Sequence, residues 1–273
     1  MKILEVLASV DRRYIFLLIA LTVIVPILLP IGMPITVTQE VQSVYDYIEK
    51  TPPGSTIIVA LDYDPSSLAE LYPMTLAVLR HAYSRKIKVL GMTLWNTGAA
   101  LGQIAMREAA EGIAQEGEDY VYLGFVPQPV SAIMGMGEDI SVVFPKDYNG
   151  TSTSEMPAMK SVKNYKDIAL LIDLAAGSTP EAWIIYAGDT YDQTIAVGCT
   201  AVSAVGYYPF LNSNQIIGLI GGMKGAAEYE KLIDTSGTAT AGMDSQSIAH
   251  IFIILLIVIA NISYFAMRKK TAQ

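Results

Sequence analysis

Two carboxylates follow a strongly apolar stretch near residue 60. Asp62 and Asp64 come directly after residues 57–61, which contain only Ile, Val, Ala and Leu. Such a run predicts a strand that is buried on both faces. Open α/β sheets bind ligands at the carboxyl ends of their strands, so this pair is a candidate site for a small polar ligand or a divalent cation. The local alternative is that Asp64 caps the helix that begins at Pro65, and that Asp62 accepts N–H groups of the turn.

Polar side chains also follow two other apolar runs. Trp95 ends the run 87–95, and Asn96 follows it. The two residues would stack on and hydrogen-bond a polar ligand at the same edge of the sheet. Asp173 lies near the end of the run 167–174 and would supply a third carboxylate. The alternatives are again local: Asn96 as a helix cap, and Asp173 as an acceptor for nearby backbone groups.

Ser178 lies at a predicted strand-to-helix turn, in the order Ala-Gly-Ser-Thr. This resembles a hydrolase nucleophile turn only superficially, because the Gly-x-Ser-x-Gly pattern is missing. A serine nucleophile needs a base, and His81 is the only histidine between residues 36 and 245. A Ser178–Lys224 dyad stays open without a supporting motif. We predict no catalytic residue and no cofactor, because the phosphate-loop and dinucleotide fingerprints are also absent.

Apolar runs alternate with helical patterns along residues 36–245. The runs predict strands, and the stretches between them have the apolar spacing of amphipathic helices. Such alternation predicts a parallel sheet with right-handed connections. We therefore expect one α/β domain with a doubly wound, Rossmann-like, mainly parallel sheet of about five strands. The predicted strands are 56–62, 87–95, 120–126, 167–174 and 194–200.

The remaining segments are predicted as helices, loops and a linker. Residues 140–144 fit either a strand or a packed loop, residues 207–210 an aromatic loop, and residues 235–242 a Gly/Ser/Thr-rich linker. Glycines near residue 220 would let the last helix pack closely on a neighbour. The predicted helices are 38–49, 65–86, 99–116, 130–136, 180–187 and 213–234.

Two charge-poor apolar segments account for much of the high mean hydropathy of +0.40. Residues 14–35 and 246–267 each suit a membrane span, and residues after the first do not form a cleavage site, so we expect an uncleaved anchor. Basic residues flank the outer ends of both segments. The positive-inside rule then predicts cytoplasmic termini, 1–13 and 268–273, and an extracytoplasmic domain at 36–245.

Charge and cysteine content narrow the range of functions. Residues 36–245 hold 12 Lys and Arg against 24 Asp and Glu, a net charge of −12, which disfavours nucleic acid as a partner. The single cysteine, Cys199, excludes an intrachain disulfide. We expect a membrane-anchored scaffold or binding subunit in a homo-oligomer or with other membrane proteins. The alternatives are a receptor-like domain for a small polar ligand or divalent cation, and a membrane-bound serine hydrolase using Ser178.

Overall fold

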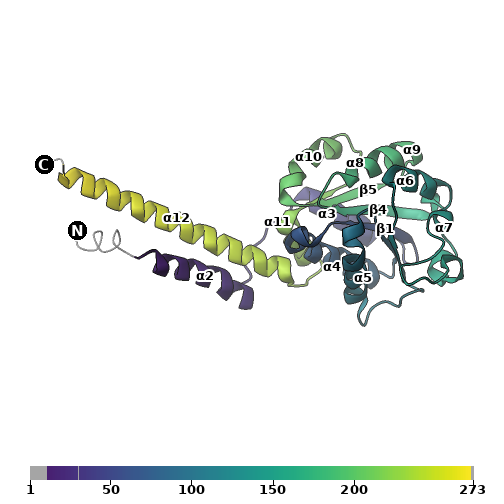
Figure 1. Cartoon of the computed structure of the whole chain (residues 1–273), viewed down its shortest axis with the longest axis horizontal. Helices are drawn as coiled ribbons and strands as arrows, with labels where there is room; N and C mark the ends of the chain where they lie inside the picture. Colours follow the sequence, from purple (N-terminus) through teal and green to yellow (C-terminus); the bar gives the residue numbers. More distant parts are fainter. Residues whose placement is uncertain (1–10, 30, 272–273) are drawn as a thin grey trace. The chain divides into compact units, whose positions relative to one another are not determined.

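The computed structural model describes residues 11–29 and 31–271. The chain divides into two units (Figure 1). Residues 35–239 form a compact α/β unit, and the segments before and after it form a helical unit.

Six parallel strands form the sheet of the α/β unit, and its spatial order is β3-β2-β1-β4-β5-β6. The central strand β1 is buried along its whole length, as its apolar run predicts. It pairs with β2 on one side and with β4 on the other, so the chain order reverses between β1 and β4. The strands are β1 (Thr56–Asp62), β2 (Lys88–Thr93), β3 (Tyr120–Phe125), β4 (Ile168–Ala175), β5 (Ile195–Cys199) and β6 (Leu219–Gly221).

Helices cover both faces of this sheet (Figure 1), so the α/β class with a mainly parallel sheet is confirmed. One layer contains α3 (Gln39–Lys50), α4 (Leu68–Ser84), α5 (Ala99–Ala110) and α11 (Gly222–Leu232). The other contains α6 (Pro129–Glu138), α7 (Ile140–Val143), α8 (Thr179–Trp183), the π-helical turn η6 (Ile184–Gly188), α9 (Asp189–Tyr191) and α10 (Ala201–Asn212). Short 3-10 turns lie at Pro65–Ser67, Asn96–Gly98, Thr153–Glu155, Pro157–Met159 and Tyr165–Asp167.

The last third of the domain differs most from the sequence-based expectation. The segment predicted as one helix over 213–234 contains a sixth strand, β6, before α11 begins. The predicted aromatic loop at 207–210 belongs to α10, and residues 140–143 are helical. The predicted linker ends early, because α12 (Thr238–Thr271) already begins at Thr238. A strand of three residues is too short to show a period of two, which is why β6 was missed.

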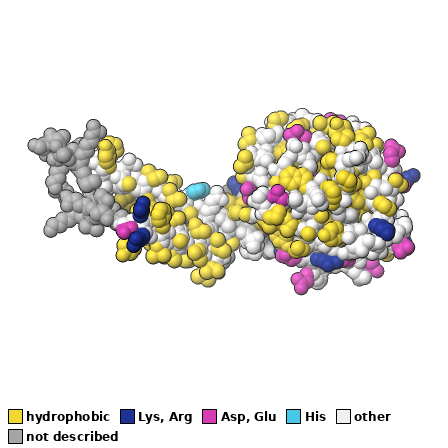
Figure 2. All heavy atoms as spheres, viewed as in Figure 1, with side chains coloured by type: hydrophobic (Ala, Val, Ile, Leu, Met, Phe, Trp, Pro, Cys, Tyr) yellow, Lys and Arg dark blue, Asp and Glu magenta, His cyan; other side chains and the backbone are white. Residues whose placement is uncertain are grey.

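The helical unit contains α2 (Arg12–Leu28) and most of α12. Exposed hydrophobic side chains cover both helices (Figure 2). Among the described residues, one helix is long and apolar enough to cross a membrane, at Thr238–Phe265. The expectation of two such spans is corrected at its first segment, because α2 has 17 residues and ends at Leu28 instead of continuing to residue 35.

Asp244 joins the segment after α2 to α12. Its carboxylate accepts the backbone N–H groups of Ile31, Gly32 and Met33 at 2.9, 2.7 and 2.9 Å. Ser245, the next residue, donates its hydroxyl to the carbonyl of Val23 at 2.9 Å. One buried acid therefore satisfies three N–H groups of the irregular backbone between the two helices.

Candidate functional site

The reversal of strand order between β1 and β4 creates the point at which open α/β sheets usually bind ligands. Asp62 is the last residue of β1, and Asp173 lies two residues before the end of β4. In the parallel register Asp173 pairs with Ala60, and Asp62 pairs with Ala175. The structure therefore brings together the two carboxylates that the sequence had placed on separate strands.

Asp62 and Asp173 are both completely buried, with 0% of the surface of each residue exposed to solvent. Asp62 Oδ1 accepts the backbone N–H of Leu94 at 2.6 Å and the hydroxyl of Thr93 at 3.0 Å. Asp62 Oδ2 and both carboxylate oxygens of Asp173 have no hydrogen-bond donor within the described chain. Buried polar atoms are almost always paired, so three unpaired carboxylate oxygens in one place demand an explanation.

A shared proton explains part of this arrangement. Burial raises the pKa of Asp173 well above its usual range, and the neighbouring charge of Asp62 raises it further. Burial also raises the pKa of Asp62, although the N–H of Leu94 and the hydroxyl of Thr93 oppose the rise. Because two adjacent buried carboxylates cannot both ionise cheaply, the pair favours a state that retains one proton.

Two further buried polar groups lie on the helix that follows β4. The hydroxyl of Thr179 lies beside both carboxyl groups and lowers the pKa of each, but it forms no well-aligned hydrogen bond with either. Trp183, one turn further along α8, has a buried indole N–H with no acceptor among the described residues. The neighbourhood of the acid pair thus contains spare donors as well as spare acceptors.

Trp95 and Tyr207 both pack against the turn that leaves β4. The ring of Trp95 comes within 2.7 Å of the position that a Cβ atom on Gly177 would occupy, so only glycine fits there. The hydroxyl of Tyr207 donates to the carbonyl of Gly177 at 3.0 Å. The charge of Asp173 raises the pKa of Tyr207, in addition to the larger effect of burial. Tyr207 therefore lies close to both the turn and the acid.

The other predicted site residues lie away from the acid pair or face solvent. Asp64 is half-buried and accepts the N–H and the hydroxyl of Ser66, so it is the local cap of the first helical turn. Ser178 is exposed in the turn after β4. Asn96 is also exposed, and its side chain caps no helix.

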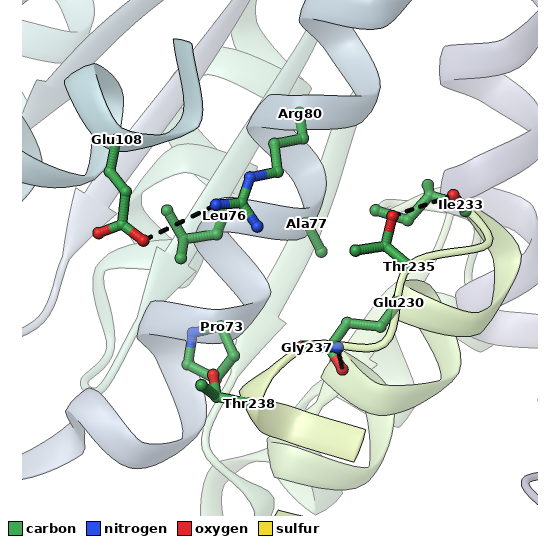
Figure 3. A pocket seen from close by; sticks show the side chains of 10 residues that line it. All are labelled: Pro73, Leu76, Ala77, Arg80, Glu108, Glu230, Ile233, Thr235, Gly237 and Thr238. Atoms are coloured by element: carbon green, nitrogen blue, oxygen red, sulfur yellow. Dashed lines mark hydrogen bonds and ion pairs between the residues drawn. The ribbon is translucent and has the colours of Figure 1, made fainter. Parts of the chain in front are cut away.

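Asn96 instead lines an open pocket of about 630 Å³ at the carboxyl end of β3. Phe125, Tyr148 and Lys146 also line it. A smaller pocket of about 230 Å³ lies between α4 and the segment that leads into α12 (Figure 3). There Glu230 accepts the N–H groups of Gly237 and Ala239, each at 3.1 Å, and so caps the start of α12.

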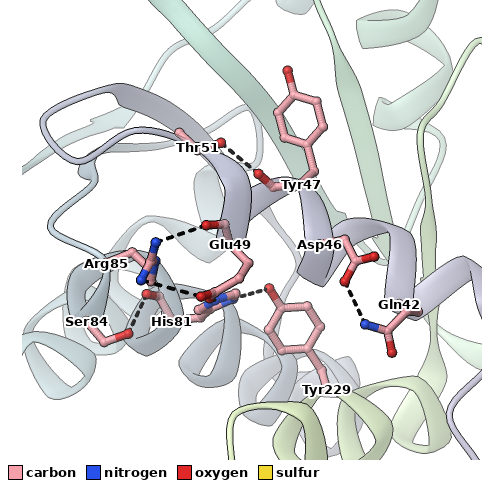
Figure 4. Close-up of polar contacts among 9 residues, drawn as sticks. All are labelled: Gln42, Asp46, Tyr47, Glu49, Thr51, His81, Ser84, Arg85 and Tyr229. Atoms are coloured by element: carbon pink, nitrogen blue, oxygen red, sulfur yellow. Dashed lines mark hydrogen bonds and ion pairs between the residues drawn. The ribbon is translucent and has the colours of Figure 1, made fainter.

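His81 is engaged elsewhere in the domain (Figure 4). Its Nδ1 lies 2.8 Å from the hydroxyl of Tyr229, and its Nε2 lies 3.0 Å from Oε2 of Glu49. Lys224 binds Glu228 on its own helix. Both candidate bases for Ser178 therefore already have partners on α3 and α11.

The sequence does not single out Thr93, Thr179 or Tyr207. Thr93 lies near the carboxyl end of the predicted strand 87–95, and Thr179 follows the predicted strand 167–174. Their positions at the ligand-binding edge of a parallel sheet are the sequence signal that could have identified them. Tyr207 has no such signal, because only the folding of α10 against β6 brings it to the turn. No group of three His, Cys, Asp or Glu side chains within the described residues converges as a metal ion requires.

No protein-family model, no curated protein and no solved structure matches this chain.

Proposed function

We propose that this chain is a membrane-anchored, receptor-like binding module whose α/β domain takes up an organic cation at Asp62 and Asp173. The observation that carries the proposal is the set of three buried carboxylate oxygens without a donor among the described residues. Keeping unpaired acids in a protein interior is costly, and replacing them with neutral groups is often stabilising. A ligand that pairs with them gives a reason for their presence.

The ligand is expected to carry N–H donors and positive charge, as an amine or guanidinium group does. Ca²⁺ takes six to eight oxygen ligands and Mg²⁺ six, whereas the pair offers three free oxygens and is completely buried, away from the waters that would complete either shell. An ammonium group needs two or three acceptors, which is the number of free oxygens that Asp62 and Asp173 offer. Binding of such a cation displaces the shared proton, so affinity is expected to increase with pH.

Uptake requires the turn after β4 to move, because neither acid is exposed. Residues 176–178 form this turn, and Trp95 and Tyr207 hold Gly177 from two sides. The aromatic rings would face an incoming cation, and aromatic faces attract cations. Thr179 follows the turn directly, and its unpaired hydroxyl supplies an additional polar contact.

Membrane anchoring is the second part of the proposal. The exposed apolar side chains of α12 support its embedding as a membrane span, with the C-terminus cytoplasmic and the α/β domain on the outer side. A membrane-impermeant maleimide should label Thr97→Cys in intact cells, since Thr97 is exposed and Cys199 is buried. Labelling only after the membrane is permeabilised would contradict this placement.

Ligand binding is tested by thermal unfolding of the full chain in detergent micelles. The probes are spermidine, arginine, tetramethylammonium, Mg²⁺ and Ca²⁺. A ligand present at 100 times its Kd stabilises the folded state by about 2.7 kcal/mol. Spermidine or arginine should raise the melting temperature, while tetramethylammonium, which has charge but no N–H group, should not.

Asp173→Asn and Asp62→Asn should each abolish this shift, and Asp64→Asn is the matched control that should keep it. Asp64 is a suitable control because it lies two residues from Asp62 but is only half-buried and serves as a cap. A shift that persists in Asp173→Asn, or the absence of a shift with every N–H-bearing probe, would count against the proposed ligand class.

A further inference from the structure

Helix α10 has one face against the domain and one face without a partner in the described chain. Its inner face contains Tyr207, which is buried, and the half-buried Ser203, Ala204 and Leu211. Its outer face contains residues at the spacing i, i+3, i+4 and i+7, namely Val202, Val205, Gly206 and Pro209. Val202 is 89% exposed and Val205 is 75% exposed. We call these four residues the outer face of α10.

This face lies in the longest stretch of the α/β domain without charge. No Asp, Glu, Lys or Arg occurs between residues 193 and 223. The rest of the domain is strongly acidic, since residues 36–245 carry a net charge of −12. An uncharged apolar helix face on an acidic domain is therefore a local exception to the surrounding surface.

Gly206 is the residue whose presence the domain itself does not explain. It lies in the middle of α10, where glycine costs about 1 kcal/mol relative to alanine. A Cβ atom added at Gly206 would have no described atom within 4 Å, and the residue has an ordinary helical backbone. By contrast, a Cβ on Gly218 or Gly222 would collide with neighbouring side chains of the domain. A small residue at 206 makes room for something outside the domain.

We propose that the outer face of α10 is the contact between two copies of this chain, packed helix against helix around a two-fold axis. The α/β domains of two copies repel each other, since residues 36–245 of each carry a net charge of −12, and an uncharged face is where they approach at the lowest electrostatic cost. A two-fold contact uses the same patch on both copies, so a single apolar stripe is sufficient. Gly206 at its centre allows the two helices to approach closely.

A second copy fits this face better than a lipid surface does. Helices that lie on membranes combine an apolar face with Lys and Arg that bind anionic headgroups. The segment 193–223 contains neither residue, and the acidic domain around it repels anionic lipid. If both copies are anchored in one membrane, as proposed above, anchoring also raises their effective concentration.

The test is the mass of the full chain in mild detergent, measured by light scattering after gel filtration. The wild-type chain should be a dimer. Val205→Glu places two like charges in the contact and should weaken association by more than roughly tenfold. Val142→Glu is the matched control, because Val142 is also a valine with 75% exposure but lies on α7. This control should remain a dimer.

Crosslinking gives a second, independent readout. Gly206→Cys should form a disulfide-linked dimer under mild oxidation, because residue 206 lies near the proposed two-fold axis, while Val142→Cys should not. A monomeric wild-type chain at micromolar concentration would overturn the proposal, and so would a Val205→Glu variant that stays dimeric. Loss of dimerisation with retained cation binding would leave the ligand site intact, so failures of the two proposals are distinguishable.

Discussion

The hydroxyl of Tyr229 on α11 lies 2.8 Å from Nδ1 of His81 on α4, and this contact joins α11, near the end of the α/β unit, to α4, near its start. The other ring nitrogen, Nε2, contacts Glu49 on α3, the first helix of the unit. Tyr45, also on α3, stacks on the imidazole ring with 4.6 Å between ring centroids. His81 therefore links the two helices through which the chain enters and leaves the domain (Figure 4).

We predict that this link weakens on acidification. Burial lowers the pKa of His81, and Arg85 adds to this, while contact with Glu49 opposes it. When the pKa of a histidine is lower in the folded than in the unfolded chain, its contribution to stability is fully present above the unfolded-state pKa of about 6.5. That contribution is lost as the pH falls through the folded-state pKa. The free energy of unfolding, measured in urea between pH 8 and pH 5, should therefore decrease toward pH 5.

His81→Gln keeps polar groups at the same place but does not titrate, so it should abolish this pH dependence. Both chains are compared in an Asp173→Asn background, because the buried acid pair has the opposite pH dependence. An unchanged slope in the His81→Gln chain would show that other groups cause it.

Asp173→Asn should stabilise the domain at neutral pH. An asparagine amide brings an N–H donor next to Asp62 and carries no ionisable proton. The raised pKa of Asp173 means that its contribution becomes increasingly unfavourable as the pH rises above about 3.9. We expect a gain of roughly 1–4 kcal/mol in the free energy of unfolding at pH 7.5, as for other replacements of buried ionisable groups.

The same urea titration, repeated across pH, distinguishes this effect from improved packing. The gain should diminish as the pH falls toward 4, because protonation removes the charge that burial disfavours in the wild-type pair. Asp64→Asn, in the half-buried cap of the first helical turn, should give no gain. Destabilisation by Asp173→Asn at neutral pH would mean that the pair supports the fold rather than straining it.

Gly98→Ala should destabilise the domain by about 1–3 kcal/mol, the usual cost of overpacking. An added Cβ would lie 2.5 Å from the carbonyl oxygen of Tyr63 and 3.1 Å from that of Leu61. Both belong to the backbone at the end of β1, which has no side-chain freedom with which to relieve the contact. Thr97→Ala in the same exposed turn should cost little, and equal costs for both changes would contradict the proposed collision.

Asp244→Ala should expose the backbone that follows α2. Hydrogen exchange reports this directly, because the amide hydrogens of Ile31, Gly32 and Met33 are the ones that bind the carboxylate. Loss of a charged acceptor worth about 1.5–3 kcal/mol should speed their exchange by roughly tenfold or more. Asp11→Ala is the control, since that carboxylate caps the start of α2 at Arg13. Unchanged exchange at residues 31–33 would contradict the contact.

The main strands were predictable because each has its own local signal. Residues 57–61 are uninterrupted apolar residues, and β1 covers Thr56–Asp62 as expected. Asp64 was also predictable as a cap, because its hydrogen bond to Ser66 spans only two residues. By comparison, β6 is three residues long and lies next to β5, so its strand character comes from its neighbour rather than from its own sequence.

The amino-acid sequence by itself determined the α/β class, the apolar segments at both ends and the position of Asp62 at the end of a buried strand. The tertiary structure decided which polar groups meet. Asp62 and Asp173 are 111 positions apart, and they become neighbours because β4 inserts beside β1. The spacing of apolar residues depends on contacts that one helix or strand makes with the core, so it can be read from a short segment. Strand order depends instead on long crossover connections, whose free energy comes from contacts across the whole domain. The pairing of the two acids, and the exposed outer face of α10, are therefore properties of the fold.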